Sequence, residues 1–165
     1  MTFERAIEAA TEQPPDAYSW LGLVLTNFAV AEQALGELSL ALGLPIEKGS
    51  LSSLESVRQK LQTANTRKCK TLESRIERWC RNRPIRHLLA HATVTLLTDG
   101  NGQQVLATRH LPRDKDDVTP DRLWTEADRI EILRQATNDG RSIRDHVRGL
   151  LADVATMRAL QSAAK

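Results

Sequence analysis

Residues 17–42 have the sequence AYSWLGLVLTNFAVAEQALGELSLAL, which is the most apolar segment of this chain. Asp16 is suited to cap the start of a helix here, and Gly43 followed by Pro45 is suited to end it. Further apolar residues occur around the whole circumference, as in a helix that is central in a bundle or lies at a subunit interface. The most apolar face carries Trp20, Val24, Ala31, Leu35, Leu38 and Leu42.

A membrane span is not expected in this segment. Glu32 and Glu37 interrupt it, and its longest uncharged run, residues 17–31, is shorter than the ~18–20 apolar residues that a span needs. Residues 1–13 are amphipathic and acidic, which predicts a short helix that ends at Pro14-Pro15 and not an apolar leader. We expect a cytoplasmic protein without a membrane segment.

Composition favours helices over strands. The 165 residues are 41% hydrophobic but only 4% aromatic, and the abundant Leu, Ala and Arg lose little conformational freedom in a helix. The length suits one domain over residues 1–165. Cys69 and Cys80 are expected on one helix, too far apart to form a disulfide. We therefore predict a single, mostly α domain of about five helices.

Positive charge is concentrated between Arg58 and His91. This stretch holds ten Lys and Arg residues against two acids, a net charge of +8, and the whole chain is +2, so the remainder is −6. We predict helices over 52–64 and 66–81, the second with one apolar face and one basic face. A basic face is either solvated or in contact with a polyanion. Its apolar residues are Cys69, Leu72, Ile76, Trp79 and Cys80, and its basic ones Arg67, Lys70, Arg75, Arg78 and Arg81.

The next segments predict two interruptions of the helical pattern. Pro84 is expected to kink or interrupt the helix, so that a short new helix over 85–91 begins there. Residues 93–110 then predict a β-hairpin around Asp99-Gly-Asn-Gly102. A mobile loop is expected over about 111–122.

Two further helices are expected in the last third of the chain. Thr125-Glu-Ala-Asp128 has the form of a capping box, and Asp139-Gly140 is expected to end the helix that it starts. A last helix with Ile143, Val147, Leu150, Val154 and Met157 on one face would close the bundle.

Residues 81–91, RNRPIRHLLAH, contain side chains suited to RNA cleavage. In-line cleavage needs a base, an acid and positive charge that stabilises the phosphorane. Imidazole titrates near neutral pH, and guanidinium offers a fixed fork of donors to phosphate oxygens. Arg86 and His91 would then act on the phosphate and the protons, with His87 beside them. The motif would lie in the first turns of the short helix, near its positive end.

This motif resembles the Arg-x4–6-His signature of HEPN domains (higher eukaryotes and prokaryotes nucleotide-binding), and Arg81 with His87 gives a second match. The helix over 17–42 resembles the family's early helix, which commonly bears an acid facing the bundle. The resemblance covers roughly residues 16–91 plus a closing helix, and the hairpin and the 111–122 loop look like additions. The sequence departs from the family at Ala92, where glycine is common, and in having Pro84 close to the motif.

The resemblance implies a metal-independent endoribonuclease that works as a homodimer, with Arg and His of both protomers in one cleft. Arg86 would hold the phosphate, His91 would act as base or acid, and His87 would orient the phosphate or share the proton transfer. Glu32 would orient Arg86. A toxin or phage-defence setting, with an antitoxin or a nucleotidyltransferase-type partner, would be typical. From the basic stretch, Arg78, Arg81 and Arg83 are the expected RNA contacts.

Other interpretations of the same residues stay open. His87 and His91 are spaced to share a metal ion, but no third ligand is evident, so we expect no metal and no other cofactor. His91 could also be a structural residue at the bundle edge. The alternative function is a non-catalytic helical module for dimerisation or partner docking. Many members of the HEPN family have lost activity and only bind or dimerise.

Overall fold

The computed structural model describes residues 15–44, 52–110 and 121–162. These residues form five helices and one small antiparallel sheet, and 74% of them are helical. The elements in chain order are α2 (Ala17–Ala41), α3 (Ser52–Ala64), α4 (Arg67–His91), β1 (Thr93–Thr98), β2 (Gln104–Arg109), β3 (Arg122–Trp124), α5 (Glu126–Leu151) and α6 (Val154–Ser162). The prediction of a mostly α chain is confirmed. The short helix expected over residues 1–13 lies outside the described residues.

The chain divides into two compact units, and three helices run through both. One, called here the sheet unit, comprises residues up to 26 and 83–135. The other, the helical unit, comprises residues 27–82 and those from 136 onward. The start of α2, the end of α4 and the start of α5 therefore belong to the sheet unit. None of the helices in the described ranges is both long and apolar enough to cross a bilayer.

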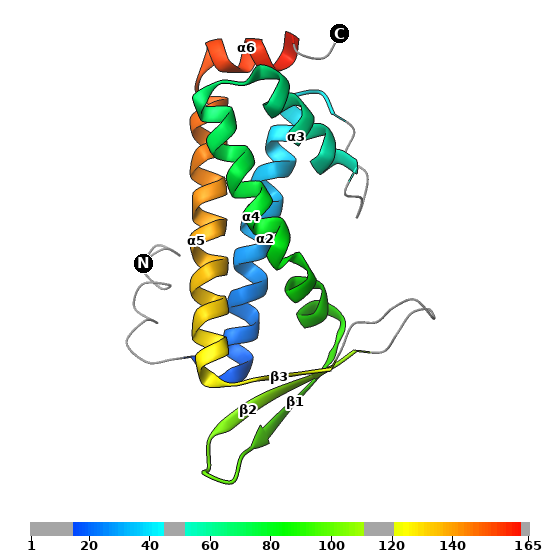
Figure 1. Cartoon of the computed structure of the whole chain (residues 1–165), viewed down its shortest axis with the longest axis vertical. Coiled ribbons are helices and arrows are strands. Elements are labelled where there is room, and N and C mark those ends of the chain that lie inside the picture. The colour runs from blue at the N-terminus through cyan, green and yellow to red at the C-terminus, as the bar shows by residue number, and fades with distance from the viewer. Residues whose placement is uncertain (1–14, 45–51, 111–120, 163–165) are drawn as a thin grey trace. The chain divides into compact units, whose positions relative to one another are not determined.

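In the helical unit the segments of α2, α4 and α5 lie side by side, and α3 packs on α6 (Figure 1). The Phe28 and Trp79 rings approach with centroids 6.3 Å apart. The apolar face predicted for α4 is buried, including Cys69, Leu72 and Ile76. Both cysteines are free, as expected from their spacing. Burial of these faces is what favours the three helices over the unfolded chain.

The predicted boundaries of α2 are confirmed, because local interactions set them. Asp16 accepts hydrogen bonds from the backbone N–H groups of Tyr18 and Ser19, both at 3.0 Å. Gly43 has a φ of +66°, and its N–H donates to the carbonyl of Leu40. With the Leu44 N–H bound to Ser39, these bonds form a Schellman motif at the helix end.

The interruption predicted at Pro84 is wrong, since α4 continues through it from Arg67 to His91. Proline removes one backbone hydrogen bond and is unfavourable inside a helix. On its C-terminal side, however, Leu88 and Leu89 are buried. Their packing offsets the local cost, so tertiary contacts decide the outcome here and not the propensity of proline.

The helix end predicted at Asp139-Gly140 is also wrong, because α5 runs unbroken from Glu126 to Leu151. A Cβ added to Gly140 would lie 2.6 Å from the backbone oxygen of Asn27 on α2. Gly140 therefore allows α2 and α5 to approach closely, and it is not a helix-ending C-cap residue. Asp139 is buried beside it and is paired with Arg78 of α4.

The sheet unit contains the predicted hairpin and a third strand that was not predicted. β1 and β2 pair antiparallel from Thr93↔Arg109 to Thr98↔Gln104, with a turn at the expected place. β3 adds to β2 through three pairs, with Trp124 opposite Leu106. Arg122, assigned to the loop over 111–122, is thus part of a strand. The rest of that loop up to residue 120 lies outside the described residues.

Two tryptophans form the core where β3 joins α5. The Trp20 and Trp124 ring centroids are 5.7 Å apart, and both side chains are fully buried. Trp20 Nε1 donates to the carbonyl of Arg129 at 2.6 Å, and Trp124 Nε1 donates to Thr108 Oγ1 at 2.9 Å. The predicted capping box is confirmed at the start of α5, since Thr125 and Asp128 exchange hydrogen bonds.

Candidate functional site

The Arg/His motif lies at the end of α4 in the sheet unit. Leu88 and Leu89 anchor this end in the core, which leaves Arg86 and His87 half-buried and His91 exposed. The predicted location near the positive end of a helix is wrong, because Pro84 does not start a new helix. The motif occupies the last two turns, where the helix dipole presents partial negative charge and favours cationic side chains.

His87 and His91 form a pair of imidazoles at the helix end. Their ring centroids are 4.7 Å apart and the rings are tilted by 52°. The pair follows from their i, i+4 spacing, which places both side chains on one face of α4. Two imidazoles at this separation can act on one small group, one taking up a proton while the other supplies one.

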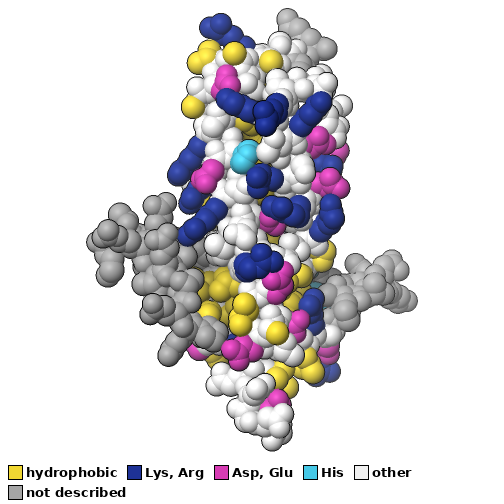
Figure 2. Space-filling model, turned by 60° about the vertical axis from the view of Figure 1, so that its left-hand side comes forward, with side chains coloured by type: hydrophobic (Ala, Val, Ile, Leu, Met, Phe, Trp, Pro, Cys, Tyr) yellow, Lys and Arg dark blue, Asp and Glu magenta, His cyan; other side chains and the backbone are white. Residues whose placement is uncertain are grey.

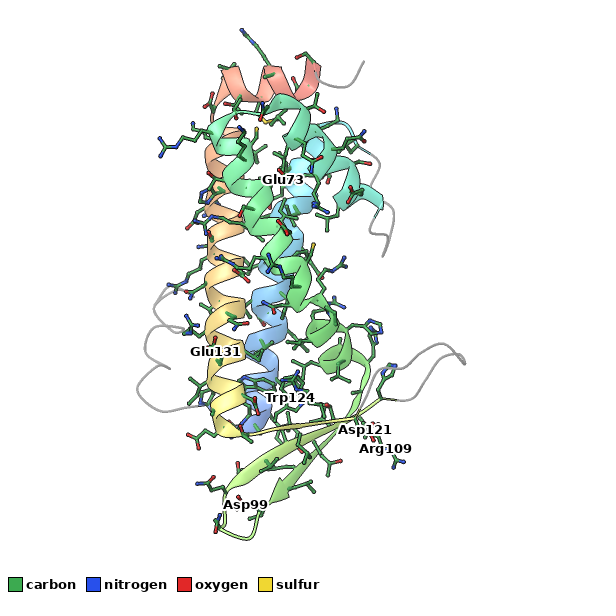
Figure 3. The ribbon with its side chains drawn as sticks, in the orientation of Figure 1. Glu73, Asp99, Arg109, Asp121, Trp124 and Glu131 are labelled. Carbon is green, nitrogen blue, oxygen red and sulfur yellow. The ribbon has the colours of Figure 1, made fainter. Side chains whose placement is uncertain are left out.

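His110, which the sequence analysis missed, adds a third imidazole. Its ring centroid is 6.1 Å from that of His87, and only 6% of the residue is exposed. Its backbone N–H donates to Asp121 Oδ1 at 3.1 Å. In Figure 3 Asp121 and Arg109 lie next to each other between β2 and β3, and their charged atoms are 3.9 Å apart. The hydrogen bond from the His110 backbone to Asp121 therefore fixes His110 at the end of β2, beside the end of α4.

The hairpin register could have revealed His110. Thr93 follows α4 almost directly and pairs with Arg109, the last residue of β2. The chain therefore returns, after one hairpin, to the helix end that it left. Any residue just after β2 must lie near the last turn of α4, and in this chain that residue is a histidine.

The gathered groups suit proton transfer and anion binding. Three imidazoles lie together at one helix end and one strand end, and Arg86 precedes His87 in the same helix. Within the described ranges, no three His, Cys, Asp or Glu side chains form an arrangement that could hold a metal ion. His110 is therefore not placed as a third ligand to a metal ion shared by His87 and His91.

The three arginines expected to contact RNA have different surroundings. Arg78 is in an ion pair with buried Asp139, with Nε 2.8 Å and Nη2 2.7 Å from Oδ1. Arg81 lies 3.5 Å from Glu77 on the same helix face and is exposed. Arg83 is half-buried in the sheet unit, whereas the other two belong to the helical unit. On the face in Figure 2, basic side chains are numerous, but acidic ones lie among them.

Glu32 is half-buried on α2 in the helical unit, whereas Arg86 belongs to the sheet unit. The expectation that Glu32 orients Arg86 stays a prediction. Comparison with known proteins found no matching family model, no similar curated protein and no similar solved structure.

Proposed function

We propose that this chain is a HEPN-like, metal-independent endoribonuclease whose site is the end of α4. The observation that carries the proposal is the grouping of the His87 and His91 rings, 4.7 Å apart, with the His110 ring 6.1 Å from that of His87. Imidazole pairs with a guanidinium nearby are suited to phosphodiester cleavage without a metal ion. The HEPN resemblance adds a homodimer with a shared cleft, an RNA substrate and a cytoplasmic setting with an antitoxin-type partner.

In the proposed reaction one imidazole takes the proton of the ribose 2′-hydroxyl as that oxygen attacks phosphorus. The bond from phosphorus to the 5′-oxygen breaks, and a protonated imidazole donates its proton to the leaving oxygen. The products are a 2′,3′-cyclic phosphate and a 5′-hydroxyl. Arg86 offers two donors to the non-bridging oxygens, where negative charge grows in the transition state. His91, the exposed imidazole, is the group best able to reach the RNA.

The test is cleavage of single-stranded RNA by the purified full chain in excess EDTA. The expected products carry 2′,3′-cyclic phosphate ends, and Arg86→Ala and His91→Ala remove the activity. His146→Ala is the matched control, since this histidine lies on α5 in the helical unit, with Nδ1 2.8 Å from the Ser142 carbonyl oxygen. Cleavage that is equal in all variants would show a contaminating nuclease and reject the proposal.

One observation favours the alternative, a non-catalytic docking module. The sheet has an outward face, opposite to the one with Leu106 and Trp124, on which Leu97 and Leu123 are 45% and 61% exposed. These two leucines are exposed apolar side chains on this face that another protein could cover. A module of this kind would show no cleavage in EDTA, and Leu123→Lys would change its association state or partner binding.

A further inference from the structure

Arg129, in the first turn of α5, has a buried guanidinium without hydrogen-bond partners for two of its nitrogens. The residue is 7% exposed, and Nε and Nη1 are enclosed and unpaired within the part of the chain that the structure describes. Arginine stays protonated at any ordinary pH, so this is a positive charge removed from water. Buried charges are normally paired, and each exception needs an explanation.

Two acceptors next to Arg129 in the sequence are already in use. Its own carbonyl accepts the Trp20 Nε1–H. The neighbouring carboxylate of Asp128 accepts hydrogen bonds from Thr125, and these hold the pKa of Asp128 below its ordinary value. Neither acceptor serves the Arg129 guanidinium, so a ligand with its own oxygens and negative charge would satisfy it.

A second guanidinium borders the same core. Arg122 lies over the Trp124 ring with its central carbon 4.0 Å from the ring centroid, and Trp124 packs against Trp20. Arg122 is exposed, whereas Arg129 is enclosed. The first turn of α5 adds the positive end of a long helix dipole. The same turn carries the carboxylates of Glu126 and Asp128, so an anion here would be held chiefly by the two guanidiniums, which engage a doubly charged oxyanion more strongly than a singly charged one.

We propose that Arg129 is the buried donor of an oxyanion site that takes a phosphate group, with Arg122 as a second, exposed cation. This inference is independent of the ribonuclease proposal, because it uses neither the histidines nor Arg86. Phosphate would offer acceptor oxygens to Nε and Nη1, the two nitrogens without partners. Binding to the folded state alone would then stabilise the protein in proportion to the logarithm of phosphate concentration.

The test is thermal unfolding of the full chain in inorganic phosphate and in chloride at equal ionic strength. Phosphate is expected to raise the Tm of the wild type and of Arg134→Met, an exposed arginine of α5 that pairs with Glu131. Arg129→Met should abolish the increase, and Arg122→Met should weaken phosphate binding roughly tenfold, as loss of one charge-assisted contact does. Methionine fills much of the same volume without charge, so the variant is expected to fold.

A direct readout guards against a variant that does not fold. In the wild type, the Nε–H signal of Arg129 in ¹⁵N NMR should shift on titration with phosphate, while that of Arg134 should not. An equal effect of phosphate on the wild type and on Arg129→Met, without this shift, would overturn the site. Acetate acting as strongly as phosphate through Arg129 would overturn the assignment to phosphate.

Discussion

The two parts of α4 use arginine in different ways. In the helical unit Arg78 reaches Asp139, a buried carboxylate of α5, and forms an ion pair. In the sheet unit Arg86 directly precedes His87, whose ring lies near those of His91 and of His110 at the end of β2. The local pattern is similar in both places, an arginine on an amphipathic helix. For Arg78 the neighbouring helix α5 supplies the carboxylate that holds the arginine. For Arg86 we propose a role in RNA cleavage.

This comparison separates stability from activity along one helix. Substitutions in the helical unit should lower stability and leave the chemistry of the site intact. Substitutions at the end of α4 should lower the activity and leave the stability of the fold nearly unchanged.

His91→Ala should reduce RNA cleavage by about 10²–10⁴-fold, the range for loss of a proton-transfer group. His91 is exposed, so the Tm should change by less than about 2 °C, as for other surface substitutions. Initial rates in EDTA and a thermal melt measure both. A large loss of Tm with the loss of activity would show a structural residue and contradict the separation.

Arg78→Met should destabilise the protein by about 2–3 kcal/mol, because it leaves the Asp139 carboxylate buried without its cation. This loss of stability is smaller than that for a fully buried ion pair, because the Arg78 side chain is 54% exposed, whereas that of Asp139 is only 4% exposed. Urea unfolding gives the number. Arg81→Met removes an exposed pair with Glu77 and should stay within about 0.5 kcal/mol. Equal losses in the two variants would contradict the account.

Gly140→Ala should cost about 1–3 kcal/mol, because the new methyl group would lie 2.6 Å from the Asn27 backbone oxygen and force α2 and α5 apart. Gly149→Ala on the same helix has nothing within 4 Å and should stabilise by about 0.5–1 kcal/mol. The difference between the two variants in urea unfolding is the measurement. A neutral Gly140→Ala would mean that the close approach does not exist.

His110→Leu should lower RNA cleavage by roughly tenfold, less than loss of a group that transfers protons itself. The reason is that His110 is buried beside His87 and is expected to act through it, by restricting its ring. NMR titration of the His87 ring, with His146→Leu as the control variant, detects this without any RNA. A His87 titration curve that does not change in His110→Leu would show that the two rings are not coupled.

The smallest effect is expected at the start of α4, where Lys68 Nζ lies 2.6 Å from Asp153 Oδ2. This hydrogen bond, with that from Thr156, lowers the pKa of Asp153 to about 2 from the ordinary 3.8. Because the pKa in the folded state is depressed, its stabilisation is present above about pH 4 and is lost as pH falls toward 2. Lys68→Met should raise this pKa in an NMR titration. The pKa of Glu131, about 2 beside Arg134, should not move.

The sequence predicted those features that nearby residues determine. Both ends of α2 and the start of α5 were found because Asp16, Gly43 and the Thr125–Asp128 box act within a few residues of themselves. The hairpin was found because its turn residues are adjacent. The pair of His87 and His91 was likewise predictable from helical spacing alone.

The sequence did not predict features that depend on residues far apart in the chain. Gly140 resembles a helix end until the Asn27 backbone is placed against it. Pro84 resembles a break until the packing of the leucines beyond it is known. β3 is only three residues long, too short to give an alternating pattern. His110 reaches the site only through the register of the hairpin, which periodicity does not provide.

The most direct test of the central claim is the chemistry of the RNA ends left by the full chain in excess EDTA. We expect 2′,3′-cyclic phosphate and 5′-hydroxyl ends, no cut at a nucleotide that carries a 2′-O-methyl group, and product formation at least about a hundredfold slower in His91→Ala. Products with 3′-hydroxyl and 5′-phosphate ends, or cleavage at an unchanged rate in His91→Ala, would contradict the proposed site.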